Sequence, residues 1–166
     1  RLRARGEAAD GLQEVYARVI NYAIAGRPAD LTVTTHVCRG NFRSAWVSSG
    51  GYEPVAETLL AGLNYDGYFL EYDTERAGGF EPLRFLPRGD KVAVLGLVTS
   101  KTGALEKADD IRRRIDEAAR FAPLEQLALS PQCGFASTEE GNLLTEEQQW
   151  DKLRFVVDVA GKVWGR

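Results

Sequence analysis

One imidazole and two thiols stand out in this chain, because they are its only histidine and its only cysteines and they fall in two short segments. His36 and Cys38 follow an apolar and β-branched run that begins at Leu31, and Cys133 follows a second apolar run. In an extended chain, residues two apart leave the same face, so His36 and Cys38 can reach one small cation. A thiolate from a second strand would complete a set of three protein ligands that suits Zn²⁺. The pattern therefore predicts a catalytic zinc site.

The chemistry of thiols indicates what such a site would do. A free thiol with a pKa of about 8.5 is mostly unreactive at neutral pH, whereas a zinc-bound thiol is deprotonated and stays a nucleophile. Cys38 and Cys133 could instead form a disulfide, but an acidic chain with so few thiols is typical of the cytoplasm, where disulfides are rare. We expect a cytoplasmic protein.

Composition excludes several other classes of function. The chain has 166 residues, of which 44% are apolar and 27% charged, as in an ordinary globular domain. A net charge of -3 and a pI near 5.3 do not fit a nucleic-acid partner, and the arginines at 112–114 have acidic neighbours, as on a solvated helix face. No apolar run approaches the ~20 residues of a membrane span. We expect neither nucleic acid nor membrane among the partners.

The chain must position these residues through alternating strands and helices. Apolar runs bounded by turn residues predict strands over 31–35, 68–72, 91–98 and 125–129. Helical spacing of apolar residues predicts helices over 8–26, 54–63 and 105–122, with at most a short helix over 81–86. A capping box from Thr145 to Gln148 predicts where the last helix begins.

Strands that alternate with helices imply an α/β fold with parallel pairing and right-handed crossovers. A helix followed by four strand-helix units is half of the (β/α)8 TIM barrel, which typically needs ~250 residues. We therefore expect residues 1–166 to be a single domain, the C-terminal half of a larger barrel. The unusual polar residues all follow strand ends, where barrel active sites lie: His36, Cys38, Glu71, Asp73, Ser100, Lys101 and Cys133.

Four ordered motifs carry a family resemblance. The segments at 36–41, 69–73, 97–103 and 129–135 read HVCRGN, FLEYD, LVTSKTG and LSPQCGF. Together they resemble the C-terminal part of the cobalamin-independent methionine synthase family, most closely its short members without the extra N-terminal domain. The resemblance spans essentially the whole chain. The combination is specific for the superfamily, but zinc alkyltransferases for other thiols share the metal motif.

This resemblance implies a zinc-dependent methyltransferase on a (β/α)8 barrel, which transfers a methyl group from a 5-methyltetrahydrofolate-type donor to homocysteine. By motif, His36, Cys38 and Cys133 match the family's zinc ligands, and Glu71 matches its carboxylate ligand. The residues with which the family holds its substrates lie mainly in the first half of the barrel. We therefore expect this chain to be inactive alone and to need the N-terminal half of the barrel, or a second copy of the chain, as a partner.

Other functions remain open on the sequence. A related enzyme could alkylate another thiol, for example in the transfer of an epoxide to coenzyme M. The zinc could also be structural, with four closed ligands that contribute only folding energy. A third class is a non-catalytic zinc-binding half-barrel that associates through its exposed sheet edges.

Several candidate substrate-binding residues could instead have a purely structural or solvent-exposed role. Arg39 and Asn41 could contact a substrate carboxylate or be solvated loop residues. Ser100 and Lys101 could receive an anion at a helix entrance, although such a segment is more often only a helix cap. Asp73 could replace Glu71 as the fourth zinc ligand or contact substrate.

Overall fold

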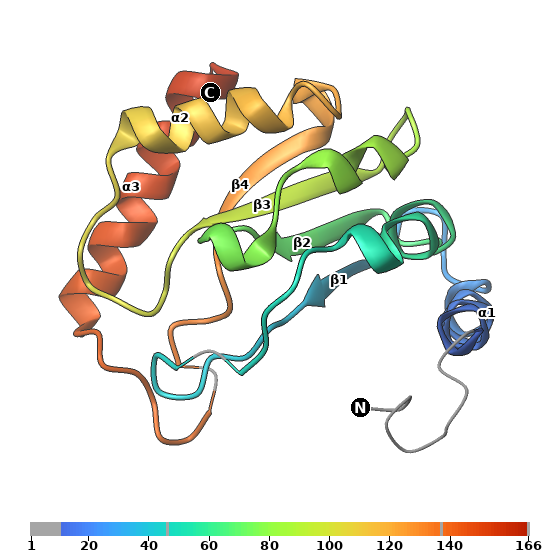
Figure 1. Cartoon of the computed structure of the whole chain (residues 1–166), viewed down its shortest axis with the longest axis horizontal. Helices are drawn as coiled ribbons and strands as arrows, with labels where there is room; N and C mark the ends of the chain where they lie inside the picture. Colours follow the sequence, from blue (N-terminus) through green and yellow to red (C-terminus); the bar gives the residue numbers. More distant parts are fainter. Residues whose placement is uncertain (1–10, 46, 137, 166) are drawn as a thin grey trace.

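The computed structural model describes residues 11–45, 47–136 and 138–165. Its centre is one parallel sheet of four strands in the order β1-β2-β3-β4, so that each strand lies beside the next one in sequence (Figure 1). The strands are β1 (Thr34–Val37), β2 (Gly67–Glu71), β3 (Val92–Val98) and β4 (Leu127–Pro131). This confirms the predicted α/β fold with parallel strands. β1 and β4 begin later than predicted, at Thr34 and Leu127.

The described residues form three α-helices around the sheet: α1 (Leu12–Ile24), α2 (Ala108–Ala118) and α3 (Glu146–Trp164). The predicted capping box begins α3, because the Thr145 side chain accepts from the Gln148 backbone and the Gln148 side chain accepts in return. The predicted helix over 54–63 is replaced by a 3-10 turn and a π-helical turn, and 3-10 turns take the place of a helix after β2. These short elements are η2 (Glu53–Val55), η3 (Glu57–Ala61), η4 (Glu75–Ala77), η5 (Glu81–Phe85) and η6 (Leu124–Gln126).

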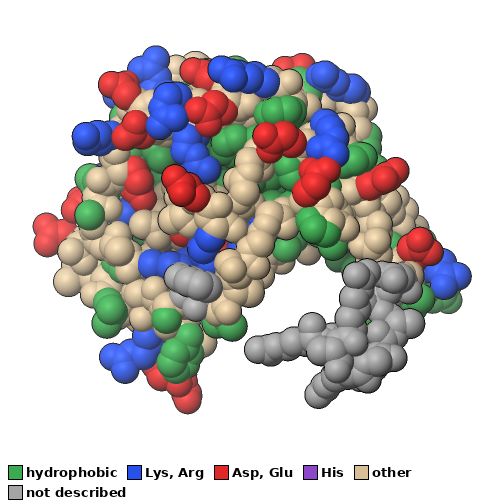
Figure 2. All heavy atoms as spheres, in the orientation of Figure 1, with side chains coloured by type: hydrophobic (Ala, Val, Ile, Leu, Met, Phe, Trp, Pro, Cys, Tyr) green, Lys and Arg blue, Asp and Glu red, His purple; other side chains and the backbone are tan. Residues whose placement is uncertain are grey.

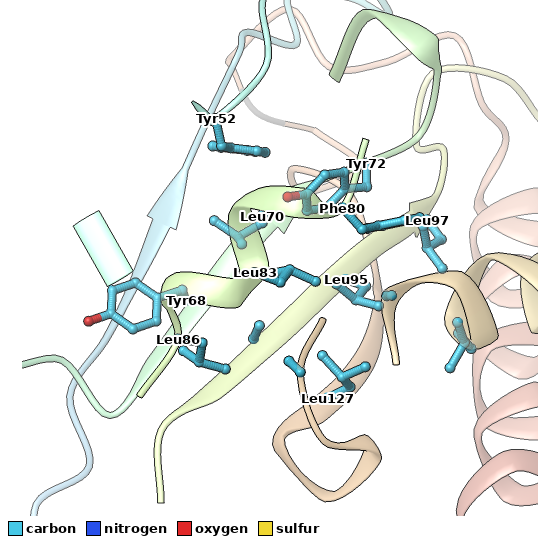
Figure 3. Close-up of a cluster of buried hydrophobic side chains, with 14 of the residues drawn as sticks. Tyr52, Tyr68, Leu70, Tyr72, Phe80, Leu83, Leu86, Leu95, Leu97 and Leu127 are labelled. Atoms are coloured by element: carbon cyan, nitrogen blue, oxygen red, sulfur yellow. The ribbon is translucent and has the colours of Figure 1, made fainter. Parts of the chain in front are cut away.

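The hydrophobic core lies on one face of the sheet (Figure 3). Alternate residues of β2 and β3 point into it, and Tyr68, Leu70 and Leu95 are all at most 1% exposed. Ile111 and Ile115 of α2 pack against the same cluster.

Figure 2 shows Lys, Arg, Asp and Glu side chains intermixed over the upper part of the molecule in this view, where α2 lies in Figure 1. No helix within the described ranges has the length and apolarity needed to cross a membrane.

The opposite face of the sheet is much more open. Phe69, in the middle of β2, is 38% exposed, and Thr34 and His36 of β1 are exposed as well. In register, His36 lies beside Phe69, and Glu71 lies beside Gly96 of β3. Because all four strands are parallel, their carboxyl ends meet at one edge, and the predicted polar residues are brought to that edge.

Candidate metal centre

Four side chains from three strand ends converge at the carboxyl edge of the sheet. One ligand atom each of His36, Cys38, Glu71 and Cys133 lies within 4.8 Å of the other three. The Cys133 sulfur is 3.1 Å from the Cys38 sulfur and 3.4 Å from Nε2 of His36. The Cys133 thiol also donates a 2.5 Å hydrogen bond to Oε1 of Glu71, which lies 3.8 Å from Nε2 of His36. These are the four residues that the sequence motifs singled out.

The centre is buried on one side and open on the other. Glu71 is fully buried and Cys133 is 7% exposed, whereas the side chain of His36 is 39% exposed and Cys38 is also exposed. A metal ion or small molecule would therefore approach this centre from the side of β1.

A tight loop holds Cys38 in place. The backbone N–H of Gly40 donates to the Cys38 sulfur at 3.2 Å. Gly40 has φ +94, and a Cβ at this position would lie 2.5 Å from a side-chain carbon of Val47. Glycine is therefore required here both by conformation and by space.

Glu71 is anchored through its backbone by Tyr52. The Tyr52 hydroxyl accepts from the Glu71 N–H at 2.7 Å and donates to the Glu71 carbonyl at 3.2 Å. Oε2 of the Glu71 carboxylate is buried without a hydrogen-bond partner, and the Arg76 guanidinium lies 3.8 Å from it. A buried, under-satisfied carboxylate oxygen of this kind is available for a cation.

The electrostatics of the centre favour a metal. Burial raises the pKa of the Cys133 thiol, and its hydrogen bonds to Glu71 and Cys38 raise it further. A carboxylate and a second sulfur this close disfavour another negative charge, whereas a divalent cation would stabilise the thiolate.

The donor set fits zinc. Both cysteines are free. Ligands at about 2.0–2.3 Å from a tetrahedral Zn²⁺ lie roughly 3.3–3.8 Å apart, and three separations, of 3.1, 3.4 and 3.8 Å, are close to that range. The Cys133 sulfur and Oε1 of Glu71, at 2.5 Å, would have to move apart to bind one zinc ion. Two sulfurs, one imidazole nitrogen and one carboxylate oxygen are also the ligand types that zinc prefers over magnesium or calcium.

Arg39 and Asn41 are buried beside the centre and already have protein partners. The Arg39 guanidinium lies 4.3 Å from the centre of the Tyr52 ring and donates to the Arg76 carbonyl. Nδ2 of Asn41 donates to Oγ of Ser100 and to the Gly134 carbonyl, whereas its buried Oδ1 has no hydrogen-bond partner. Asn41 thus joins the loops that follow β1, β3 and β4.

Asp73, Ser100 and Lys101 lie outside the four-residue cluster. β2 ends at Glu71, and the Asp73 carboxylate lies 3.4 Å from the Arg76 guanidinium, so Asp73 does not take the place of Glu71 in the cluster. Ser100 is fully buried against Asn41. The Lys101 ammonium donates to Gln132 at 2.8 Å.

Sequence reasoning missed three residues around the centre: Tyr52, Arg76 and Gln132. Gln132 directly precedes Cys133, and Arg76 lies three residues after Asp73, so their positions in the chain were a signal that could have been used. No local pattern indicates Tyr52, because its partner Glu71 is 19 residues away.

The fold and the centre define a class: a parallel α/β domain that gathers candidate metal ligands, two of them cysteine sulfurs, at the carboxyl edge of its sheet. Sequence comparison gives the family. Residues 4–162 match the model of the family described as the catalytic domain of cobalamin-independent synthase, and the chain belongs to this family.

Two curated proteins of Bacillus subtilis (strain 168) are similar over almost the whole chain. YxjH is 64% identical and YxjG 63% identical over 163 residues, and both are described as uncharacterized. The match covers 98% of this chain but only 43% of each relative. The chain thus spans less than half the length of the curated relatives it matches.

Solved structures agree with this assignment. A Listeria monocytogenes protein provisionally assigned as a vitamin-B12-independent methionine synthase is 50% identical, with a TM-score of 0.74 over 95% of this chain and 42% of that one. A B12-independent methionine synthase from Shewanella sp. W3-18-1, in complex with selenomethionine, has a TM-score of 0.73 over 94% of this chain and 45% of that one. At 21% identity, the second match supports the fold alone.

Proposed function

We propose that this chain carries the zinc centre of an enzyme that transfers a methyl group from a 5-methyltetrahydrofolate-type donor to a thiol such as homocysteine. The proposed ligands are His36, Cys38, Glu71 and Cys133. The observation that carries the proposal is their convergence within 4.8 Å at the strand ends. Membership of the cobalamin-independent synthase family supports the reaction class.

Bound zinc would supply a deprotonated, nucleophilic substrate thiol at neutral pH. The protein would keep that sulfur electron-rich, because two thiolates and one carboxylate give the ligand set three negative charges. The substrate sulfur would attack the methyl carbon, so that a carbon–sulfur bond forms while the donor's carbon–nitrogen bond breaks. The donor nitrogen would keep the electron pair and take a proton.

Glu71 would hold the metal as its carboxylate ligand, and it is the ligand that could give way to a substrate thiolate. Its Oε2 lies 3.8 Å from the Arg76 guanidinium, which could hold the displaced carboxylate. Cys133 and Glu71 form the buried floor of the centre, and His36 and Cys38 form its exposed side. The substrate would therefore enter over β1.

The chain alone is proposed to be half of a (β/α)8 barrel and inactive. Its relatives are more than twice as long as the matched region, and the sheet face around Phe69 is open. A cavity of about 750 Å³ on this face, at the amino ends of the strands, is lined by Thr34, Phe69 and Val94 among others. The partner proposed to cover it is the N-terminal half of the barrel, with a second copy of this chain as the alternative.

The first test is metal content, with zinc-edge X-ray absorption on the chain and on Cys133→Ser. We expect stoichiometric zinc with about two sulfur ligands in the parent chain and loss of zinc in the variant. The proposal would be contradicted if neither the chain alone nor the full-length protein took up zinc on reconstitution.

Activity requires the full-length protein. Transfer should be assayed with homocysteine and with coenzyme M as acceptors, before and after treatment with a chelator. We expect homocysteine to be alkylated, activity to disappear with the metal, and zinc to restore it. Unchanged thiol alkylation by the metal-free enzyme would rule out the proposed mechanism, and preference for coenzyme M would favour the alternative alkyltransferase.

A further inference from the structure

Gln132 is a buried residue next to a proposed ligand, and the reaction described above does not use it. It directly precedes Cys133 and is 8% exposed. Its side-chain oxygen accepts two hydrogen bonds, from the Lys101 ammonium at 2.8 Å and from the Thr99 hydroxyl at 2.9 Å. Both donors belong to the loop that follows β3. Gln132 therefore ties the segment that carries Cys133 to the neighbouring strand.

Lys101 is an unusual hydrogen-bond donor to Gln132, because its ammonium is buried. It is 9% exposed, and in the part of the chain that the structure describes no carboxylate oxygen lies within ion-pair distance of its ammonium. Burying a cation without a carboxylate partner is costly. A neutral amide that accepts its hydrogen bond keeps the cation in place without adding negative charge beside the metal centre.

The backbone alone does not fix the position of Cys133. Among the described residues β4 is an edge strand that pairs with β3 alone, and the register of that pair shifts between Gly96 and Val98. Pro131 ends the strand and has no N–H to donate. The last ladder contact is the Gln132 N–H, which donates to the Val98 carbonyl at 2.9 Å. After this bond, the position of Cys133 depends on side-chain contacts.

The loop after β3 is itself anchored from α3. The Thr99 N–H donates to Oε1 of Glu106 at 2.8 Å, and Glu106 forms an ion pair with the fully buried Lys152 at 3.1 Å. The Lys152 ammonium also donates to the Ala104 carbonyl at 2.7 Å. A continuous set of contacts therefore runs from the interior of α3 to the residue before Cys133.

We propose that Lys101 and Gln132 are positioning residues that hold the Cys133 sulfur in the geometry needed to bind the metal. The proposal rests on the proposed zinc centre and gives Lys101 a structural task in place of substrate contact. Outer contacts that orient a metal ligand typically change metal affinity about 10- to 100-fold when they are removed.

The test uses Co²⁺ as a spectroscopic probe in the full chain, followed by competition with Zn²⁺. Lys101→Met and Gln132→Leu should each lower metal affinity about 10- to 100-fold and weaken the sulfur-to-cobalt charge-transfer absorption. The double variant should bind about as well as Gln132→Leu alone, because Gln132→Leu already breaks the contact with Lys101 as well as the one with Thr99. Lys101→Arg, which retains a donor, should restore much of the signal. Lys107→Met removes an exposed lysine six positions away and is the matched control.

The outcomes separate this proposal from the one on which it rests. Absence of cobalt and zinc binding in both the parent chain and the full-length protein contradicts the metal centre itself. A parent that binds metal, together with folded Lys101→Met and Gln132→Leu variants of unchanged affinity and spectrum, overturns the positioning role. If either variant fails to fold, Thr99→Val removes one of the two donors to Gln132 from a partly exposed site. It should then give a smaller loss of affinity, and parental binding by Thr99→Val would overturn the proposal.

Discussion

The Tyr52 hydroxyl forms both a donated and an accepted hydrogen bond with the backbone of Glu71, at 3.2 and 2.7 Å. These bonds fix the end of β2 at the residue whose side chain enters the metal centre. Burial raises the pKa of Tyr52, so the hydroxyl stays protonated and able to donate. The ring is held between the Arg39 guanidinium and the ring of Tyr72, whose centre is 5.1 Å away.

Tyr52→Phe should keep the ring contacts and remove only the two hydrogen bonds. We expect a loss of about 1 kcal/mol in the free energy of unfolding, because the buried Glu71 backbone groups lose a partner. Zinc affinity should fall about tenfold. Chemical denaturation and competition with a zinc chelator measure the two effects. Tyr16→Phe changes an exposed tyrosine and should alter neither; equal effects of the two substitutions would contradict the anchoring role of Tyr52.

The stability of the metal-free chain should fall at alkaline pH. The pKa of Cys133 is raised in the folded state, so folding favours the protonated thiol. Its contribution is fully present below the unfolded-state pKa of about 8.5 and is lost as pH rises above it. The expected slope is about 1.4 kcal/mol per pH unit for one proton. With zinc bound, the thiol is already deprotonated and this slope should vanish. Urea denaturation between pH 7 and 10 tests this, with Cys133→Ser as the control.

Removal of the metal should expose the two thiols unequally. Cys38 is exposed and Cys133 is buried, so a thiol reagent should modify Cys38 first after chelation. With zinc bound, both should react more slowly than free thiolates, because each cysteine sulfur donates an electron pair to the metal and is held in the coordination geometry. Mass spectrometry after timed alkylation shows the order. Equal rates for the two cysteines, or no protection by zinc, would contradict the arrangement of the centre.

Lys152→Met should be strongly destabilising. Lys152 is fully buried and pairs with Glu106, whose side chain is 21% exposed. Removing one partner of a buried ion pair typically costs about 3–5 kcal/mol, and we expect the lower part of that range because Glu106 retains some solvent. Adding Glu106→Gln should recover part of the loss, whereas Glu106→Gln in the parent should itself destabilise. Thermal and chemical unfolding of the three variants forms a double-mutant cycle, and additive effects would show that the pair is not coupled.

Local patterns in the sequence predicted most of the framework. The continuous apolar run of β3 and the capping box of α3 depend on residues a few positions apart, and both elements form close to where they were expected. The helix predicted over 54–63 did not form as a regular α-helix. The residues of this segment take a conformation that buries Ala56 and Leu60 fully in the core. In so short a segment, tertiary packing outweighs the preference for a regular α-helix.

The sequence by itself determined the family, the parallel α/β fold and the placement of chemical groups at strand ends, because periodicity and short motifs are local properties of the chain. Only the tertiary structure decided that Asp73 turns away to Arg76, that Tyr52 anchors Glu71 and that Lys101 reaches Gln132. The last two contacts join residues 19 and 31 positions apart and depend on strand register and on the paths of loops. No local pattern encodes such distances, because they arise only when the strands pair and the core packs.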